Sequence, residues 1–219
     1  MLNTLKKYVP NFIREKTERL FGRHVYCKAY DQLECIYIHI PKTAGSSIGT
    51  SLFATSTPGH WTAETYLWTN RIKFKKYYKF TVVRNPWDRL ASAYFYLKAG
   101  GKNKSDSEWA KNNLSEFKSF EDFIKTGLHQ KHIIGWVHFK PQYKFLELTN
   151  KKIGLDYIGR FENLQEDFNT IANHLEVKAV LPHTNQSERP SYKDLYSQET
   201  IRIVANIYQK DISLFDYEF

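Results

Sequence analysis

The sequence predicts an α/β domain in which a central parallel β-sheet is flanked by helices. Three short segments rich in apolar and β-branched residues have the length of strands, and a helical pattern of apolar residues follows each of them. Strands that alternate with helices are typical of parallel sheets covered on both faces. The chain has 219 residues, 42% of them hydrophobic, and is therefore long enough to bury such a core.

The first two strand–helix units have the same order. A strand is expected at 35–40, where CIYIHI ends at a proline that cannot donate to a following ladder. The small-residue segment PKTAGSS then forms a loop, and a helix is expected at 47–56. A second strand, KFTVV at 79–83, ends at ArgAsnPro and leads into a helix at 87–97.

The middle of the chain contains a run of helix-breaking residues and a helix-capping pair. GGKNKSDS at 100–107 predicts a flexible loop because it is rich in glycine and charge. Ser119 and Asp122 have the spacing of a capping box, which would open a helix that stops at Gly127.

The last strand–helix unit completes the predicted domain. LDYIG at 155–159 is the third strand candidate, and helices are expected at 164–175 and 198–209. These elements give one domain over 31–219, preceded by an N-terminal helical arm over 1–30.

The composition favours an anionic partner. Lysine and arginine number 32 against 23 aspartate and glutamate, a formal net charge of +9. That excess suits nucleic acid, a phosphorylated cofactor, an anionic sugar or a membrane surface, and does not choose among them.

Nothing in the chain indicates export. The first residues carry charges every few positions without an apolar signal region, and no segment approaches the roughly 18 apolar residues of a transmembrane helix. Cys27 and Cys35 are too few for a disulfide framework and favour free thiols in a reducing compartment, although one bridge between them stays open. A cytoplasmic location is expected.

The loop PKTAGSS is the first candidate site. A small-residue turn between a strand end and a helix start gathers backbone N–H groups at a positive dipole end. Lys42 adds a mobile charge, and Thr43, Ser46 and Ser47 add hydroxyl groups, which together predict a phosphate cradle. The order differs from the common P-loop, in which the lysine comes last. The alternative is an ordinary helix start with serine caps.

The segment RNPWDRLASAY at 84–94 is the second candidate site. Arg84 ends the second strand, so in a parallel sheet it lies at the same edge as Lys42, where ligands bind in open α/β sheets. An arginine fork matches a phosphate, and Ser92 follows two helical turns later. The alternative is that Arg84 pairs with Asp88 while Ser92 only packs.

These motifs carry a family resemblance. YIHIPKTAGSS resembles the 5′-phosphosulfate-binding loop of sulfotransferases, and VVRNPWDRLASAY resembles their 3′-phosphate-binding strand and helix. Both are most similar to carbohydrate sulfotransferases of the heparan sulfate 2-O-sulfotransferase type and their bacterial relatives. The resemblance continues more weakly in HFKPQYKFL, IGRFENLQEDF and the tail 183–219, so it extends over nearly the whole chain from Cys35 onward.

The resemblance implies a P-loop-like sulfotransferase fold. It also implies transfer of a sulfuryl group from 3′-phosphoadenosine 5′-phosphosulfate (PAPS) to a hydroxyl of a carbohydrate acceptor, by in-line displacement without a metal. Positioning and electrostatics supply most of the catalysis in such transfers. By the resemblance the 5′-phosphosulfate is held by Lys42, Thr43, Ala44, Gly45, Ser46 and Ser47, and the 3′-phosphate by Arg84 and Ser92, with Ser187 and Arg189 of the tail loop as further contacts.

Two catalytic residues are expected. Lys42 would offset charge that builds on the leaving phosphate. His60 is the predicted general base, because it lies between the two motifs, where similar enzymes place their catalytic histidine, and because histidine titrates near neutral pH. Glu64 is the second candidate for the base.

The acceptor is expected to be an oligo- or polysaccharide, with anionic ones among the candidates. No metal site is predicted, because His129, His132 and His138 lack a cysteine or carboxylate at zinc-ligand spacing. The oligomeric state stays open.

Two other functions remain as alternatives. A nucleotide-dependent kinase would use the phosphate cradle, but the order of the P-loop is wrong and no convincing magnesium-binding aspartate ends a strand. A basic nucleic-acid-binding module would use the positive charge and aromatic residues, but no such motif is present and a nucleic-acid partner is not expected.

Overall fold

A three-stranded parallel sheet forms the centre of the protein. The computed structural model describes residues 25–54, 59–181 and 191–219. The strands are β1 (Cys35–Tyr37), β2 (Tyr78–Val83) and β3 (Tyr157–Arg160), with β2 in the middle. Tyr37 pairs with Phe80 and Val83 with Arg160, both in parallel register, so the predicted parallel sheet is confirmed.

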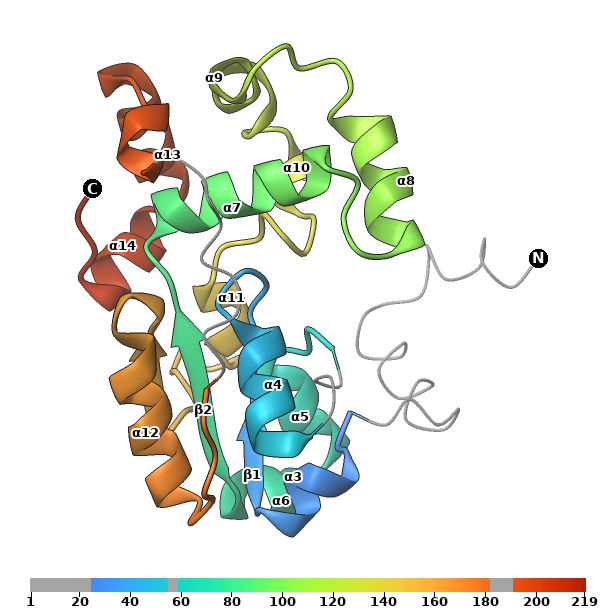
Figure 1. Ribbon diagram of the computed structural model, residues 1–219, viewed down its shortest axis with the longest axis vertical. Coiled ribbons are helices and arrows are strands. Elements are labelled where there is room, and N and C mark those ends of the chain that lie inside the picture. Colours follow the sequence, from blue (N-terminus) through green and yellow to red (C-terminus); the bar gives the residue numbers. More distant parts are fainter. Residues whose placement is uncertain (1–24, 55–58, 182–190) are drawn as a thin grey trace.

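Both faces of the central strands are covered. All residues of β1 and all of β2 except Tyr78 are buried, although successive side chains point to opposite faces. The helix α4 (Gly45–Phe53) follows β1 (Figure 1). The helix α12 (Leu164–His174) packs on β3. At the far edge of the sheet Ile158 of β3 is 37% exposed. The predicted mixed α/β architecture, with helices flanking the sheet, is therefore present.

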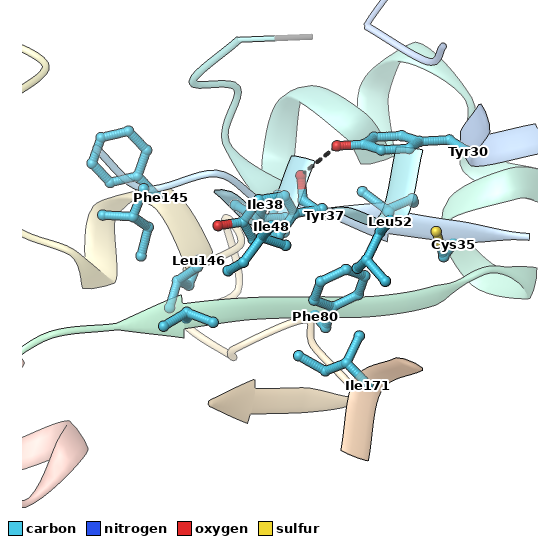
Figure 2. Close-up of a cluster of buried hydrophobic side chains, with 14 of the residues drawn as sticks. Tyr30, Cys35, Tyr37, Ile38, Ile48, Leu52, Phe80, Phe145, Leu146 and Ile171 are labelled. Carbon is cyan, nitrogen blue, oxygen red and sulfur yellow. Dashed lines mark hydrogen bonds between the residues drawn. The ribbon is translucent and has the colours of Figure 1, made fainter. Parts of the chain in front are cut away.

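Figure 2 shows the core around these strands. Tyr30 of α3 (Lys28–Gln32) donates its hydroxyl to the backbone oxygen of Tyr37 at 2.9 Å, which ties α3 to β1. The side chains that gather on β1 and β2 are Ile48 and Leu52 of α4, Phe145 and Leu146 of α11 (Tyr143–Leu146), and Ile171 of α12.

Two short helices lie between α4 and β2 in the chain. The helices α5 (Ala63–Thr69) and α6 (Arg71–Lys76) begin where Thr62 and Asn70 accept hydrogen bonds from the backbone of their first turns. Their buried residues Tyr66 and Phe74 belong to the same core as the sheet.

A second apolar cluster surrounds the helix α7 (Pro86–Lys98). This helix begins at Pro86 because Asn85 accepts from the Trp87 N–H and proline is favoured in the first turn. The cluster takes side chains from α7, α8 (Lys104–Asn113), the π-helix η1 (Phe123–Gly127) and α13 (Gln198–Ile207). The other elements are α9 (Phe120–Asp122), α10 (Lys131–Ile134), η2 (Phe161–Asn163), η3 (Tyr192–Leu195) and α14 (Gln209–Phe215).

The prediction of a loop over 100–107 is wrong for residues 104–107, which belong to a helix. The helix α8 begins at Lys104 because the side chain of Asn103 accepts from the Asp106 N–H, so the polar run contains a helix cap. The third strand lies at 157–160 instead of 155–159, and β1 ends at Tyr37, although the Ile38 N–H still donates to Phe80 at 2.9 Å.

The capping interaction at Ser119 is present, since its side chain accepts from the Asp122 N–H at 3.0 Å. The helix it opens reaches Gly127, as predicted, but changes to π-helical geometry at Phe123.

Most of the predicted arm over 1–30 lies outside the described residues. Cys27 and Cys35 are free thiols, and no helix in the described ranges is long and apolar enough to cross a membrane.

Candidate active site

The two motif segments meet at the carboxyl ends of β1 and β2. Arg84, which follows β2, donates through Nη1 to the backbone oxygen of Lys42 at 3.0 Å. Arg89 in α7 donates through Nε to the backbone oxygen of Pro41, also at 3.0 Å. Because arginines of the second motif hold the backbone of the first, 41–42 is fixed against α7.

The loop before α4 has a strained backbone. Lys42 and Ala44 have φ angles of 72° and 63°, in the left-handed region that non-glycine residues rarely adopt. The hydroxyl of Thr43 is buried and donates to the backbone oxygen of Ile40 at 2.9 Å, so it holds the turn together. A loop of this kind leading into the first turn of a helix of nine residues is suited to binding an anion.

Gly45 is required by the ring of His39. A Cβ atom at Gly45 would lie 1.7 Å from His39 Nε2, so no other residue fits without displacing the imidazole. This close approach places a buried histidine directly beneath the start of α4. Of the two serines that follow, Ser46 is exposed and Ser47 is half-buried in the first helical turn.

One face of α7 is turned toward the loop. Asp88, Ser92 and Tyr96 are spaced four residues apart and therefore share a helix face. Asp88 accepts from Arg84 Nε at 2.7 Å, and the Lys42 ammonium lies 3.9 Å from the centre of the Tyr96 ring. Ser92 is half-buried between these two contacts, so the sequence-predicted residues Lys42, Arg84 and Ser92 lie in one region.

The backbone of Arg84 is also fixed from the other side. Its N–H donates to Gln142 Oε1 at 3.0 Å, and its carbonyl accepts from Gln142 Nε2 at 2.8 Å. Its guanidinium carbon lies 3.9 Å from the centre of the Phe161 ring. The Arg84–Asp88 pairing weighed from the sequence is present, and it holds the guanidinium at the sheet edge.

Arg89 is a functional candidate that the sequence did not single out. It is 1% exposed and also donates to the backbone oxygens of His138 and Lys140, at 3.2 and 3.0 Å. Burial lowers the pKa of its guanidinium, which nearby Asp211 partly opposes. The repeated arginine in RNPWDR was the available signal, but its role depends on contacts far apart in the chain.

His60 lies beside this region, against the end of the first strand segment. Its Nδ1 is 3.0 Å from the backbone oxygen of His39, and the two rings are 4.3 Å apart. A carbonyl only accepts, so Nδ1 carries the proton and Nε2 holds the lone pair of the neutral ring. Burial lowers the pKa of His60, which keeps the imidazole neutral near pH 7.

The other candidates lie elsewhere. The Glu64 carboxylate accepts from Trp68 Nε1 at 2.5 Å and from the Thr149 hydroxyl at 2.6 Å, near the loop before β3. Ser187 and Arg189 lie outside the described residues. Asp106 contacts His138, whose ring in turn lies beside that of His60. The sequence did not identify Asp106 as a functional candidate because it was assigned to a loop.

Fold and site together define an α/β domain with a loop suited to an anion at the carboxyl edge of its sheet and a neutral histidine beside it. The chain belongs to the Sulfotransferase family, whose model matches residues 28–218. It is 35% identical over 97 residues to an uncharacterized protein from Archaeoglobus fulgidus, a match that covers 43% of this chain. The chain spans 63% of that relative's length. No solved structure matches the chain significantly.

Proposed function

We propose that this sulfotransferase moves a sulfuryl group from PAPS to a hydroxyl of a carbohydrate acceptor, with His60 as general base. The observation that carries the proposal is the direct hydrogen bond between the two motif segments, from Arg84 Nη1 to the backbone oxygen of Lys42. It brings the two segments that we propose to bind anions to one edge of the sheet, and PAPS carries anionic groups at both ends of its adenosine.

The donor groups present suit such a molecule. Lys42, the backbone of 43–45 and the hydroxyls of Ser46 and Ser47 would hold the 5′-phosphosulfate, since a helix start and an ammonium favour an anion. Arg84 and Ser92 would hold the 3′-phosphate, with Ser187 and Arg189 as further contacts. The scheme requires no metal. PAPS, when bound, supplies an activated sulfuryl group on a phosphate leaving group.

Each catalytic residue then has one task. His60 Nε2 accepts the proton of the acceptor hydroxyl while its oxygen bonds to sulfur, and the bond from sulfur to the bridging phosphate oxygen breaks. The electron pair of that bond stays on the phosphate oxygen, where the Lys42 ammonium offsets the charge. The product leaves as a sulfate ester, and His60 releases its proton to solvent.

The proposed acceptor is an oligo- or polysaccharide, anionic ones included. The formal net charge of +9 suits an anionic acceptor. The free thiols of the chain suit the proposed cytoplasmic location.

Calorimetric titration with adenosine 3′,5′-bisphosphate, without metal, tests the donor site. We expect micromolar binding that weakens about 10- to 150-fold in Arg84→Ala, because a charge-assisted hydrogen bond to phosphate contributes about 1.5–3 kcal/mol. Arg71→Ala, which removes an exposed arginine of α6, should bind as the wild type does. Thermal melting of both variants separates lost affinity from lost folding.

The same titration with ATP and magnesium distinguishes the kinase alternative. No heat with the bisphosphate, together with clear binding of ATP and magnesium, would overturn the proposal.

A further inference from the structure

A buried carboxylate lies close to the proposed base. Asp106, in the first turn of α8, is 5% exposed. Its Oδ2 accepts from the Tyr96 hydroxyl at 2.7 Å and from Asn103 Nδ2 at 2.9 Å, and its Oδ1 lies 3.1 Å from His138 Nε2. Gly101 has a φ of 66°, and a Cβ there would lie 2.5 Å from Asp106 Cβ, so the chain is shaped to admit this residue.

These contacts determine how His138 is protonated. A carboxylate oxygen only accepts, so His138 donates from Nε2 and its Nδ1 holds the lone pair of the neutral ring. Nδ1 is buried and has no hydrogen-bond partner within the described part of the chain. A buried polar atom without a partner costs about 1–3 kcal/mol and calls for a functional reason. Burial lowers the pKa of His138, which keeps the ring neutral.

The Asp106–His138 pair points toward the proposed site. The rings of His138 and His60 are 6.2 Å apart with an interplanar angle of 67°, and the ring of Tyr96 lies 5.2 Å from that of His138. Tyr96 also carries the Lys42 ammonium on its face, so it connects Asp106 to the loop residue proposed to face the leaving group.

The charges around His60 favour a role for Asp106. Burial lowers the pKa of His60, and the positive charge of Arg89 lowers it further. The hydrogen bond to the His39 carbonyl and the negative charge of Asp106 oppose this by raising it. His39 and His138 are neutral rings beside it, and the charge of Lys42 acts on His138. Asp106 is therefore the carboxylate that opposes the cost of a positive charge on His60.

We propose that Asp106, oriented by His138, is a positioning residue whose buried charge stabilises the imidazolium that His60 becomes during transfer. The inference rests on the proposed function, since it needs His60 to take a proton. That proton moves from the acceptor hydroxyl to His60 Nε2 while the O–S bond forms and the S–O bond to phosphate breaks. The new positive charge on His60 is balanced by Asp106, and no further reactant is needed.

Asp106→Asn tests this role because it removes the charge and keeps a similar shape. We expect kcat to fall about 10- to 100-fold, and the acid limb of the pH profile of kcat/KM to move to lower pH. Glu108→Gln is the matched control, since it removes a charge from an exposed position of the same helix, where the side chain is 63% exposed. It should leave both quantities unchanged, whereas a merely structural role for Asp106 would lower kcat without moving the limb.

An NMR pH titration of the His60 ring, without acceptor or turnover, separates this inference from the proposed function. The pKa of His60 should fall in Asp106→Asn, and an unchanged value would overturn the inference even in an active enzyme. Absence of sulfuryl transfer in the wild type would instead overturn the proposed function. The NMR titration would still decide whether Asp106 raises the pKa of His60.

A second pair of variants covers the case in which Asp106→Asn does not fold. His138→Gln keeps an N–H that can reach Asp106 and should preserve the wild-type pKa of His60. His138→Leu removes the donor that orients the Asp106 carboxylate and should lower the pKa of His60. Equal values in the two variants would contradict the role of His138.

Discussion

Sulfuryl transfer is expected to fall about 100- to 1,000-fold in Lys42→Ala, because one preorganised donor to a developing oxyanion is worth about that much. The ammonium is held 3.9 Å from the centre of the Tyr96 ring, at the start of the loop that leads into α4. This fixed position provides its charge without reorganisation as the leaving phosphate forms. Single-turnover measurement of transfer gives the chemical step directly.

Two further variants make the test of Lys42 specific. Lys42→Arg keeps a positive charge but changes its shape and reach, so we expect it to restore only part of the rate. Lys104→Ala removes a lysine whose side chain is 89% exposed on α8 and should transfer at the wild-type rate. A rate in Lys42→Ala within a few-fold of the wild type would rule out its catalytic role.

His60→Ala is expected to lower transfer by about 100- to 10,000-fold, the range contributed by a general base. Binding of adenosine 3′,5′-bisphosphate should be unchanged, because the hydrogen bond of His60 is made to the backbone of His39. The midpoint of the acid limb of the wild-type rate should lie below pH 6.5, since burial lowers the pKa of this histidine.

His60→Asn separates base catalysis from local structure. Its amide N–H can replace Nδ1–H in the hydrogen bond to the His39 carbonyl, but it has no basic nitrogen. We expect it to be as inactive as His60→Ala, while His132→Ala, at an exposed position of α10, keeps full activity. Substantial turnover by His60→Asn would show that another group takes the proton.

The arrangement of the two motifs could be predicted from the sequence because it depends on local pattern. Apolar runs indicated the strands, and parallel strands necessarily bring their carboxyl ends to one edge. Lys42 and Arg84 were therefore expected to be neighbours, and a hydrogen bond of 3.0 Å connects them.

The remaining contacts depend on tertiary structure that periodicity does not encode. The run GGKNKSDS looked like a loop, yet Asn103 caps a helix there and Asp106 is buried against His138 and Tyr96. Arg89 was not singled out from the sequence, but it is buried and donates to backbone oxygens 48 to 51 positions away. A polar side chain can be buried when it has hydrogen-bond partners, and here those partners are distant in the sequence. The local pattern therefore does not predict the burial.

The three neighbouring rings of His39, His60 and His138 also couple folding to acidity. Burial lowers the pKa of all three below their usual value near 6.5, so below that pH the unfolded chain binds more protons than the native protein. The free energy of unfolding therefore decreases as the pH falls below 6.5, by up to about 1.4 kcal/mol per pH unit for each histidine that stays neutral in the native state. Acid should therefore unfold this protein, because His39, His60 and His138 bind protons more readily in the unfolded chain. The same burial keeps His60 neutral in the native protein.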